Sequence, residues 1–188
     1  MNTTEMTEFE VWKTIKLGVT GRLLSGESCN IVEWCEKYGT GHVSGVSHTA
    51  VSMARDPEFR VNDPIDLDLV LVDPKEIGCT SSNFTDLCEE IKIKTGLLEC
   101  PAEVGPQLQS QWNPEEAVYL VRKDREIHVG MKTIDIYKNA RIGPMLYHFC
   151  IFIDFIPEPD GRHIYAPNLK GEPEDRTQGY FIFVKPRK

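Results

Sequence analysis

Two prolines within residues 96–112 restrict the fold more than any other feature of this sequence, because Pro101 and Pro106 stand close together between two hydrophobic runs. Each proline fixes φ and lacks a backbone N–H. If one helix ran through residues 101–111, the ring of Pro106 would clash with the carbonyl four residues back. We therefore predict a turn over residues 101–104 and a short helix that starts at Pro106, since proline is tolerated in the first turn of a helix.

The residues around this turn have helical spacing. Val104, Leu108 and Trp112 stand four residues apart and share one helical face. We predict that this stripe packs against the base of a sheet and joins two halves of one core. The polar residues between them are expected to stay in solvent: Gln107, Gln109 and Gln111. A groove beside the stripe is a candidate binding site for a ligand or a protein, with Glu103, Gln107 and Trp112 as its binding residues.

The chain before residue 112 alternates strands with helices. Strands are predicted at residues 8–17 and 65–72, with a possible short strand at 59–61. Helices are predicted after Ser28, Ser47 and Asn83, because apolar residues then recur at helical spacing. Ser47 and Asn83 are suitable N-caps, and Gly39 and Gly96 stand where helices commonly end.

The chain after residue 112 is dominated by period-two patterns. Strands are predicted at residues 117–122, 126–133, 146–155, 162–166 and 180–185, separated by polar turns. Consecutive strands joined by short turns favour antiparallel pairing. The sequence thus predicts a single α+β domain over residues 1–188, with a helix-rich half (1–112) and a strand-rich half (113–188). N-terminal helices and strands would pack on a mainly antiparallel sheet or partial barrel formed by the C-terminal half.

The segment Cys100-Pro101-Ala102-Glu103-Val104-Gly105-Pro106, preceded by Gly96-Leu97-Leu98, resembles the signature of a family of uncharacterised bacterial proteins. The likeness extends in patches to residues 11–18, 66–70 and 181–184. This chain departs from the family pattern after Leu108, where the family has an Arg-Leu pair and a Tyr and this chain has Gln109, Ser110 and Trp112. The family has no known activity, so the resemblance implies fold boundaries and no mechanism.

Charge and hydropathy exclude several classes of function. The chain has 21 Lys and Arg against 29 Asp and Glu, a net charge of −8, so no tight binding to duplex DNA or other nucleic acid is expected. No apolar run reaches the roughly 18 residues of a membrane span, and the N-terminal residues are polar and acidic, unlike a secretory signal. We therefore expect a cytoplasmic protein with no membrane contact and with reduced thiols.

The motifs that hold metals or cofactors are incomplete. None of the six cysteines forms a Cys-x-x-Cys pair, which disfavours a zinc knuckle. The glycine-rich residues 39–45 match neither the dinucleotide fingerprint nor the phosphate-binding loop of nucleotide hydrolases. Asp66 and Asp68 share a strand face without a third ligand at readable spacing, which indicates a solvated rim. No cofactor and no bound metal are expected.

Two of the predicted strands carry the most suggestive chemistry. His128 lies on the strand at 126–133, and His148, Cys150 and Asp154 lie on the one at 146–155, opposite an apolar face that includes Phe149. If the strands are neighbours, imidazoles and a thiol gather on one surface, and Asp154 could orient a base. The alternative is a solvated sheet face partly covered by the N-terminal helices.

A further thiol, Cys100, is a candidate nucleophile if a helix begins beside it, because a helix N-terminus lowers a thiol pKa. The position of Pro106 argues for a later helix start, so a buried structural thiol is favoured at Cys100.

Two hypotheses of function follow from these patterns. The first is a non-catalytic binding or protein-interaction domain that holds a protein partner or a small ligand on its sheet surface or in the groove beside Trp112. It rests on the absence of a complete catalytic motif and on the aromatic residues of the second half. The second is a small thiol- or metal-dependent enzyme centred on His128, His148 and Cys150. The sequence leaves the identity of any partner and the oligomeric state open.

Overall fold

The computed structural model describes residues 9–22, 27–39, 46–111, 127–136, 146–153, 162–165 and 179–187. Several predictions lie outside these residues: the strand at 117–122, the loop at 40–45, and the positions of Trp112 and Asp154. None of the helices in the described ranges is long and apolar enough to cross a membrane.

The fold is α+β, as predicted. The helices are α1 (Ile31–Gly39), α2 (His48–Arg55), α3 (Phe84–Thr95) and α4 (Val104–Ser110). The strands are β1 (Lys13–Leu17), β2 (Gly21–Arg22), β3 (Ser28–Cys29), β4 (Ile65–Val72), β5 (Ile127–Val129), β6 (Ile134–Asp135), β7 (Leu146–Tyr147), β8 (Cys150–Ile153), β9 (Arg162–Tyr165) and β10 (Tyr180–Val184).

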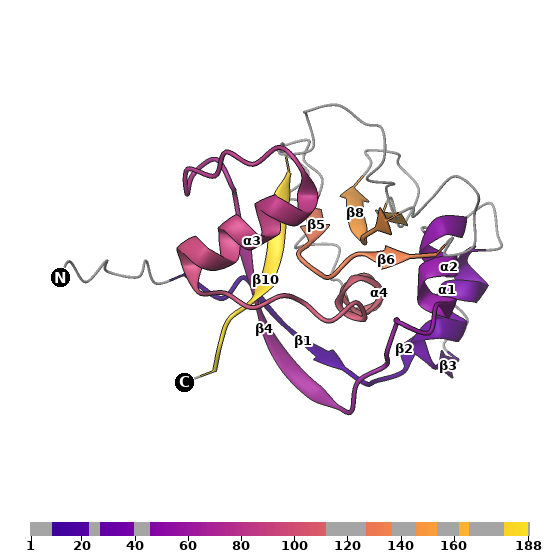
Figure 1. The fold of residues 1–188 in the computed structure, drawn as a ribbon. Coiled ribbons are helices and arrows are strands. Elements are labelled where there is room, and N and C mark those ends of the chain that lie inside the picture. Colours follow the sequence, from indigo (N-terminus) through magenta and orange to yellow (C-terminus); the bar gives the residue numbers. More distant parts are fainter. Residues whose placement is uncertain are drawn as a thin grey trace, which may run out of the picture.

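One mixed, mostly antiparallel sheet forms a half-barrel with the strand order β1-β4-β10-β5-β8-β9. Only the β10–β5 pair is parallel among these strands. The sheet is not confined to the C-terminal half of the chain, because β1 and β4 belong to it. The last strand in the sequence, β10, lies between β4 and β5 in the middle of the sheet (Figure 1, yellow).

Local signals set the bounds of α2 and α3. The hydroxyl of Ser47 accepts the backbone N–H of Ala50 at 3.1 Å, and the side-chain oxygen of Asn83 accepts the backbone N–H of Asp86 at 2.8 Å. Gly96 ends α3 with a positive φ of 71°, a conformation that costs glycine little. The predicted caps of these helices are therefore confirmed.

Helix α4 begins two residues earlier than predicted, at Val104. Pro106 is its third residue, within the first turn, where the backbone N–H groups have no intrahelical acceptor. The missing N–H of proline therefore costs nothing there. The clash argument correctly excludes a helix from residue 101 but does not require proline at the first position.

Four predicted strands differ from the structure. The strand predicted at residues 8–17 begins only at Lys13. Residues 59–61 form no strand, although Phe59 is buried and packs edge-on against Phe149 with ring centroids 6.1 Å apart. The strand at 126–133 is reduced to β5, because the carbonyl of Gly130 accepts the N–H of Cys100 at 2.8 Å and the chain leaves the ladder. The strand at 146–155 is interrupted between Tyr147 and Cys150.

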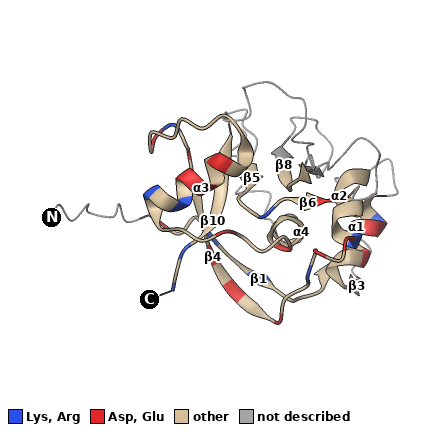
Figure 2. Ribbon diagram, viewed as in Figure 1, with Lys and Arg blue, Asp and Glu red and all other residues tan. Residues whose placement is uncertain are grey.

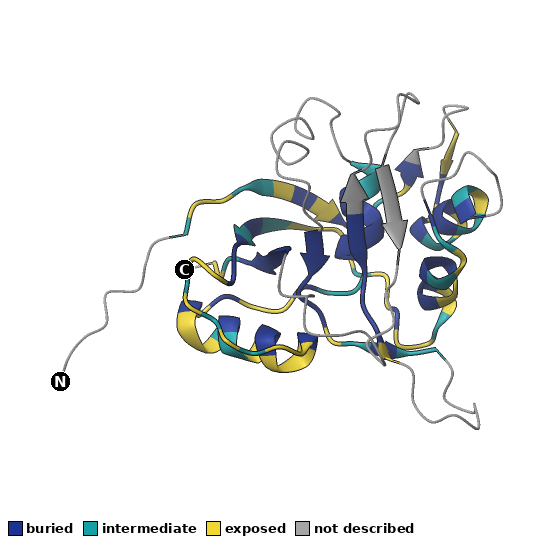
Figure 3. Ribbon diagram, turned by 90° about the horizontal axis from the view of Figure 1, so that it is seen from above, coloured by how far each residue is buried: buried dark blue, intermediate teal, exposed yellow. Residues whose placement is uncertain are grey.

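Both faces of the central strands are covered. Along β10, Tyr180, Ile182 and Val184 join the core on the side of α1, α2 and α4. Phe181 and Phe183 join the core beneath α3. Figure 3 shows the buried strands between α3 and the pair α1 and α2. A buried sheet centre explains why every residue of β10 is apolar.

Candidate functional site

The structure places two of the four candidate catalytic residues on neighbouring strands and a third in the break just before one of them. β5 and β8 pair antiparallel, and His128 lies opposite Cys150 in the register. His148 lies in the break between β7 and β8. His128 and His148 therefore lie together, and Cys150 lies opposite His128 in the strand register. Asp154 lies outside the described residues.

The two histidines form a buried pair. Nδ1 of His128 and Nε2 of His148 are 3.0 Å apart, so one ring donates an N–H to the other. Phe84, the first residue of α3, stacks on His148 with centroids 3.7 Å apart and planes 19° apart. The ring of Phe181 lies 4.9 Å from that of His128. Aromatic rings from α3 and β10 thus enclose the pair.

His128, His148 and Cys150 are buried, and burial limits their access to a substrate. His128 is 2% exposed, and His148 and Cys150 are each 0% exposed. The expectation of a solvated sheet face is wrong here, because α3 covers this part of the sheet. A general base must come within hydrogen-bond reach of the substrate proton, and the ring of Phe84 stacks directly on His148.

The second candidate nucleophile, Cys100, is a buried thiol, as favoured from the sequence. Its Sγ–H donates to the carbonyl of Ile182 at 3.3 Å. Burial raises the pKa of the Cys100 thiol well above its ordinary value, and burial raises the pKa of Cys35 to about 12. Thiols that stay protonated at neutral pH are poor nucleophiles.

Glu103, a predicted binding residue, is fully buried. One carboxylate oxygen accepts the backbone N–H of Gly18 at 2.8 Å and the side-chain amide of Gln107 at 2.9 Å. The other accepts the backbone N–H and the side-chain amide of Asn62, at 2.7 and 2.9 Å. The carboxylate therefore joins α4 to two loops that are distant in sequence, and its acceptor capacity is used inside the protein.

The glutamines of α4 do not all stay in solvent as predicted. Gln107 is 0% exposed, and its amide donates to the carbonyl of Val19 at 2.7 Å. Gln111 bonds to the backbone of Lys16. These polar side chains can pack on this face because they form hydrogen bonds with backbone groups of β1 and of the turn after it. The other side of the helix behaves as predicted, since Val104 and Leu108 are both 0% exposed.

Within the described residues, no three His, Cys, Asp or Glu side chains gather closely enough to hold a metal ion. Asp66 and Asp68 lie on β4, and the carboxylate of Asp68 accepts the hydroxyl of Thr14 at 2.7 Å. These carboxylates therefore belong to a hydrogen-bonded sheet surface.

This surface, which the sequence indicated only as a solvated rim, is the exposed continuation of the face that α3 covers. Alternation along β4 places Asp66 and Asp68 on the same face as the buried Val70 and Val72. We define the open sheet face as the polar residues on this part of the sheet: Thr14, Lys16, Asp66, Asp68 and Arg187. The acidic residues of β4 lie at the end of the strand away from α3 (Figure 2).

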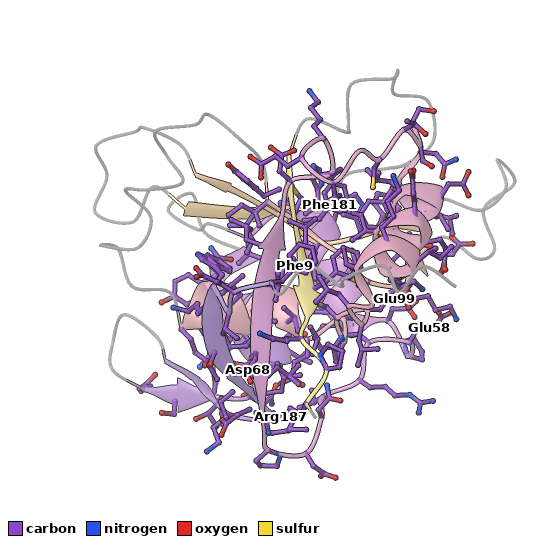
Figure 4. All side chains as sticks on the ribbon, turned by 90° about the vertical axis from the view of Figure 1, so that its left-hand side faces the viewer. Phe9, Glu58, Asp68, Glu99, Phe181 and Arg187 are labelled. Carbon is purple, nitrogen blue, oxygen red and sulfur yellow. The ribbon has the colours of Figure 1, made fainter. Side chains whose placement is uncertain are left out.

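Cross-strand contacts order the open sheet face. Lys16 lies opposite Asp66 and Thr14 lies opposite Asp68 in the register of β1 and β4. The guanidinium of Arg187 is 3.9 Å from the carboxylate of Asp68 and donates to the carbonyl of Asp66. Figure 4 shows Asp68 and Arg187 together at the end of the sheet away from Phe181.

Comparison with known proteins does not assign this chain to a family. A scan against protein-family models, a search among curated proteins and a search among solved structures all found no match. The resemblance to a family of uncharacterised bacterial proteins stays a prediction.

Proposed function

We propose that this chain is a non-catalytic binding domain that contacts another protein through its open sheet face. The observation that carries the proposal is the burial of the reactive side chains. His128, His148, Cys150 and Cys100 are all at most 4% exposed. These groups pack and hydrogen-bond inside the domain, which supports a structural use of them in place of a catalytic one.

The shape and charge of the open sheet face favour a protein partner over a small ligand. Small-molecule sites are usually concave and mostly apolar, whereas this surface is made of exposed and half-buried charged side chains. Lys16, Asp66 and Asp68 are held in register by β1 and β4, and Arg187 adds a second basic group beside Asp68. A partner surface with charges of both signs in the opposite order would complement it.

The proposal includes the cytoplasmic location expected from the sequence. All six cysteines are free, and five of them are buried. A reducing compartment keeps such thiols in the form that the core requires. The thiol- or metal-dependent enzyme is the competing hypothesis, and it requires a substrate to reach the buried histidine pair.

Charge reversal on the open sheet face tests the contact. The wild-type chain is used to isolate a partner by chemical crosslinking, and the dissociation constant of the purified pair is then measured. Asp66→Arg is expected to weaken binding at least about tenfold, because a charge reversal at a contact typically costs a kcal/mol or more. Glu76→Arg is the matched control, since Glu76 is an exposed acid beyond the other end of β4.

Equal binding by both variants would place the contact elsewhere and refute the proposed surface. Rapid alkylation of Cys150 in the folded wild-type chain, together with turnover of any substrate, would favour the enzyme instead. Thermal unfolding of each variant checks that Asp66→Arg remains folded.

A further inference from the structure

Among the strands that the structure describes, β1 lies at one end of the sheet, and one side chain occupies its outer edge. The backbone N–H of Lys16 donates to Oε1 of Gln111 at 3.0 Å, and Nε2 of Gln111 donates to the carbonyl of Lys16 at 2.7 Å. Both backbone groups of Lys16 therefore point away from β4 and are satisfied by a single amide.

The Gln111 amide reproduces the pairing that a neighbouring strand would supply. In an antiparallel ladder, a residue of the next strand accepts one N–H and donates another to the same partner residue. The amide is held in place from behind, because Nε2 of Gln111 also donates to Oε1 of Gln107 at 2.8 Å. Gln107 is itself fixed to the carbonyl of Val19. Helix α4, which carries Gln107 and ends just before Gln111, lies beside β1 (Figure 1).

Uncovered sheet edges pair with other chains, and proteins commonly protect them with charged side chains or with a covering segment. The exposed side chain of Lys16 is one such protection, and the amide of Gln111 supplies another. We propose that Gln111 is a strand mimic that closes the outer edge of β1 against pairing with β1 of a second copy of this chain.

A second copy fits this edge in a definite register. Since the backbone groups of Lys16 point outward, alternation places those of Thr14 outward as well. An antiparallel pair centred on Ile15 would place Lys16 opposite Thr14 of the second copy. It would also place Ile15 opposite its own copy, a favourable pair of β-branched side chains. This register avoids placing two lysines directly opposite each other.

Removal of the amide tests the proposal. In Gln111→Ala, exchange of the Lys16 amide hydrogen at low concentration is expected to become roughly tenfold faster, because one hydrogen bond is lost at a sheet edge. At higher concentration, sedimentation should show a dimer that the wild-type chain does not form, and protection of the Lys16 amide should return. Gln109→Ala, on the same helix, is the matched control and should behave as wild type.

A second variant distinguishes strand pairing from nonspecific self-association. Lys16→Pro in the Gln111→Ala background removes the outward N–H while the bonds to β4 remain, since proline is tolerated at an edge. This double variant should be monomeric. If Gln111→Ala fails to fold, Gln111→Glu serves in its place, because it keeps the acceptor for Lys16 and loses the donor.

Three results would overturn the proposal: a Gln111 variant that stays monomeric although its Lys16 amide exchanges rapidly, self-association that Lys16→Pro does not abolish, or a wild-type dimer that already pairs through β1.

Discussion

Replacement of the buried carboxylate of Glu103 tests how the domain is held together. Four N–H groups point at this carboxylate, from Gly18, from Gln107 and twice from Asn62, at 2.7–2.9 Å. A hydrogen bond to a charged group contributes about 1.5–3 kcal/mol, and a buried donor left without an acceptor costs about 1–3 kcal/mol. Because some donors will find water once the side chain is shortened, Glu103→Ala is expected to lower the free energy of unfolding by about 3–6 kcal/mol.

The magnitude is large against the about 5–15 kcal/mol that stabilises a typical domain. For a chain of this size, each kcal/mol lowers the melting temperature by about 2–4 °C, so Glu103→Ala should lower it by roughly 6–24 °C. Urea unfolding followed by circular dichroism gives the free energy directly. Glu103→Gln should cost less, since its amide keeps one acceptor oxygen but turns a donor toward the N–H groups.

The matched control is Glu99→Ala. The carboxylate of Glu99 is partly exposed and makes a single ion pair, with Lys92 at 3.1 Å. Exposed pairs of this kind contribute about 0–1 kcal/mol. A loss below about 1 kcal/mol for Glu103→Ala, equal to that of Glu99→Ala, would refute the structural role of Glu103. It would return this carboxylate to the list of candidate ligand-binding groups.

Three further predictions concern the buried chemistry and the acid stability of α3. Phe84→Ala should lower the free energy of unfolding by about 3–5 kcal/mol and, in the molecules that stay folded, expose His148, on which the Phe84 ring stacks, to diethyl pyrocarbonate. In the folded wild-type chain at neutral pH, Cys100 should react with iodoacetamide far more slowly than in the urea-unfolded chain, because burial raises the pKa of its thiol. Mass spectrometry after timed alkylation measures both rates. The pKa of Glu90 is lowered from 4.5 to about 2, chiefly because it accepts the Ser81 hydroxyl. A group with a depressed folded pKa stabilises the fold above its unfolded pKa, so this contribution should fade as pH falls from 4.5 towards 2. Unfolding of Glu90→Gln should lack that part of the acid dependence, and equal slopes for the two chains would contradict it.

The sequence predicts elements whose signals are local. Helix α3 is correct at both ends because Asn83 and Gly96 act on backbone groups within one turn of themselves. The faces of β5 and β8 are correct because side chains alternate strictly along a strand. Thus Val129 and Ile151 lie in one core while His128 lies beneath α3.

The errors arise where a distant segment decides the outcome. Nothing near His148 in the sequence indicates that Phe84 covers it, so a buried pair is mistaken for a solvated face. The burial of Glu103 is not predicted from the sequence, because the backbone donors to its carboxylate belong to Gly18 and Asn62, which are 85 and 41 residues away in the chain. The loop contacts that bury this carboxylate depend on the tertiary structure. Hydrophobic periodicity and secondary-structure propensity report only local structure, so they do not predict such contacts.

The central place of β10 has a consequence for the synthesis of this protein. Of the strands described in the sheet, β10 is the last in sequence, yet it alone joins the β1–β4 pair to the β5-β8-β9 group. A nascent chain that has not yet reached Tyr180 carries both groups with apolar strands open at the vacant position, including Val70 and Val129. Ribosomes that stall before this point would release a chain with two unpaired edges, a form that chaperones and proteases readily bind. Synthesis of β10 thus joins two groups of strands, each with an unpaired apolar edge, into one continuous sheet.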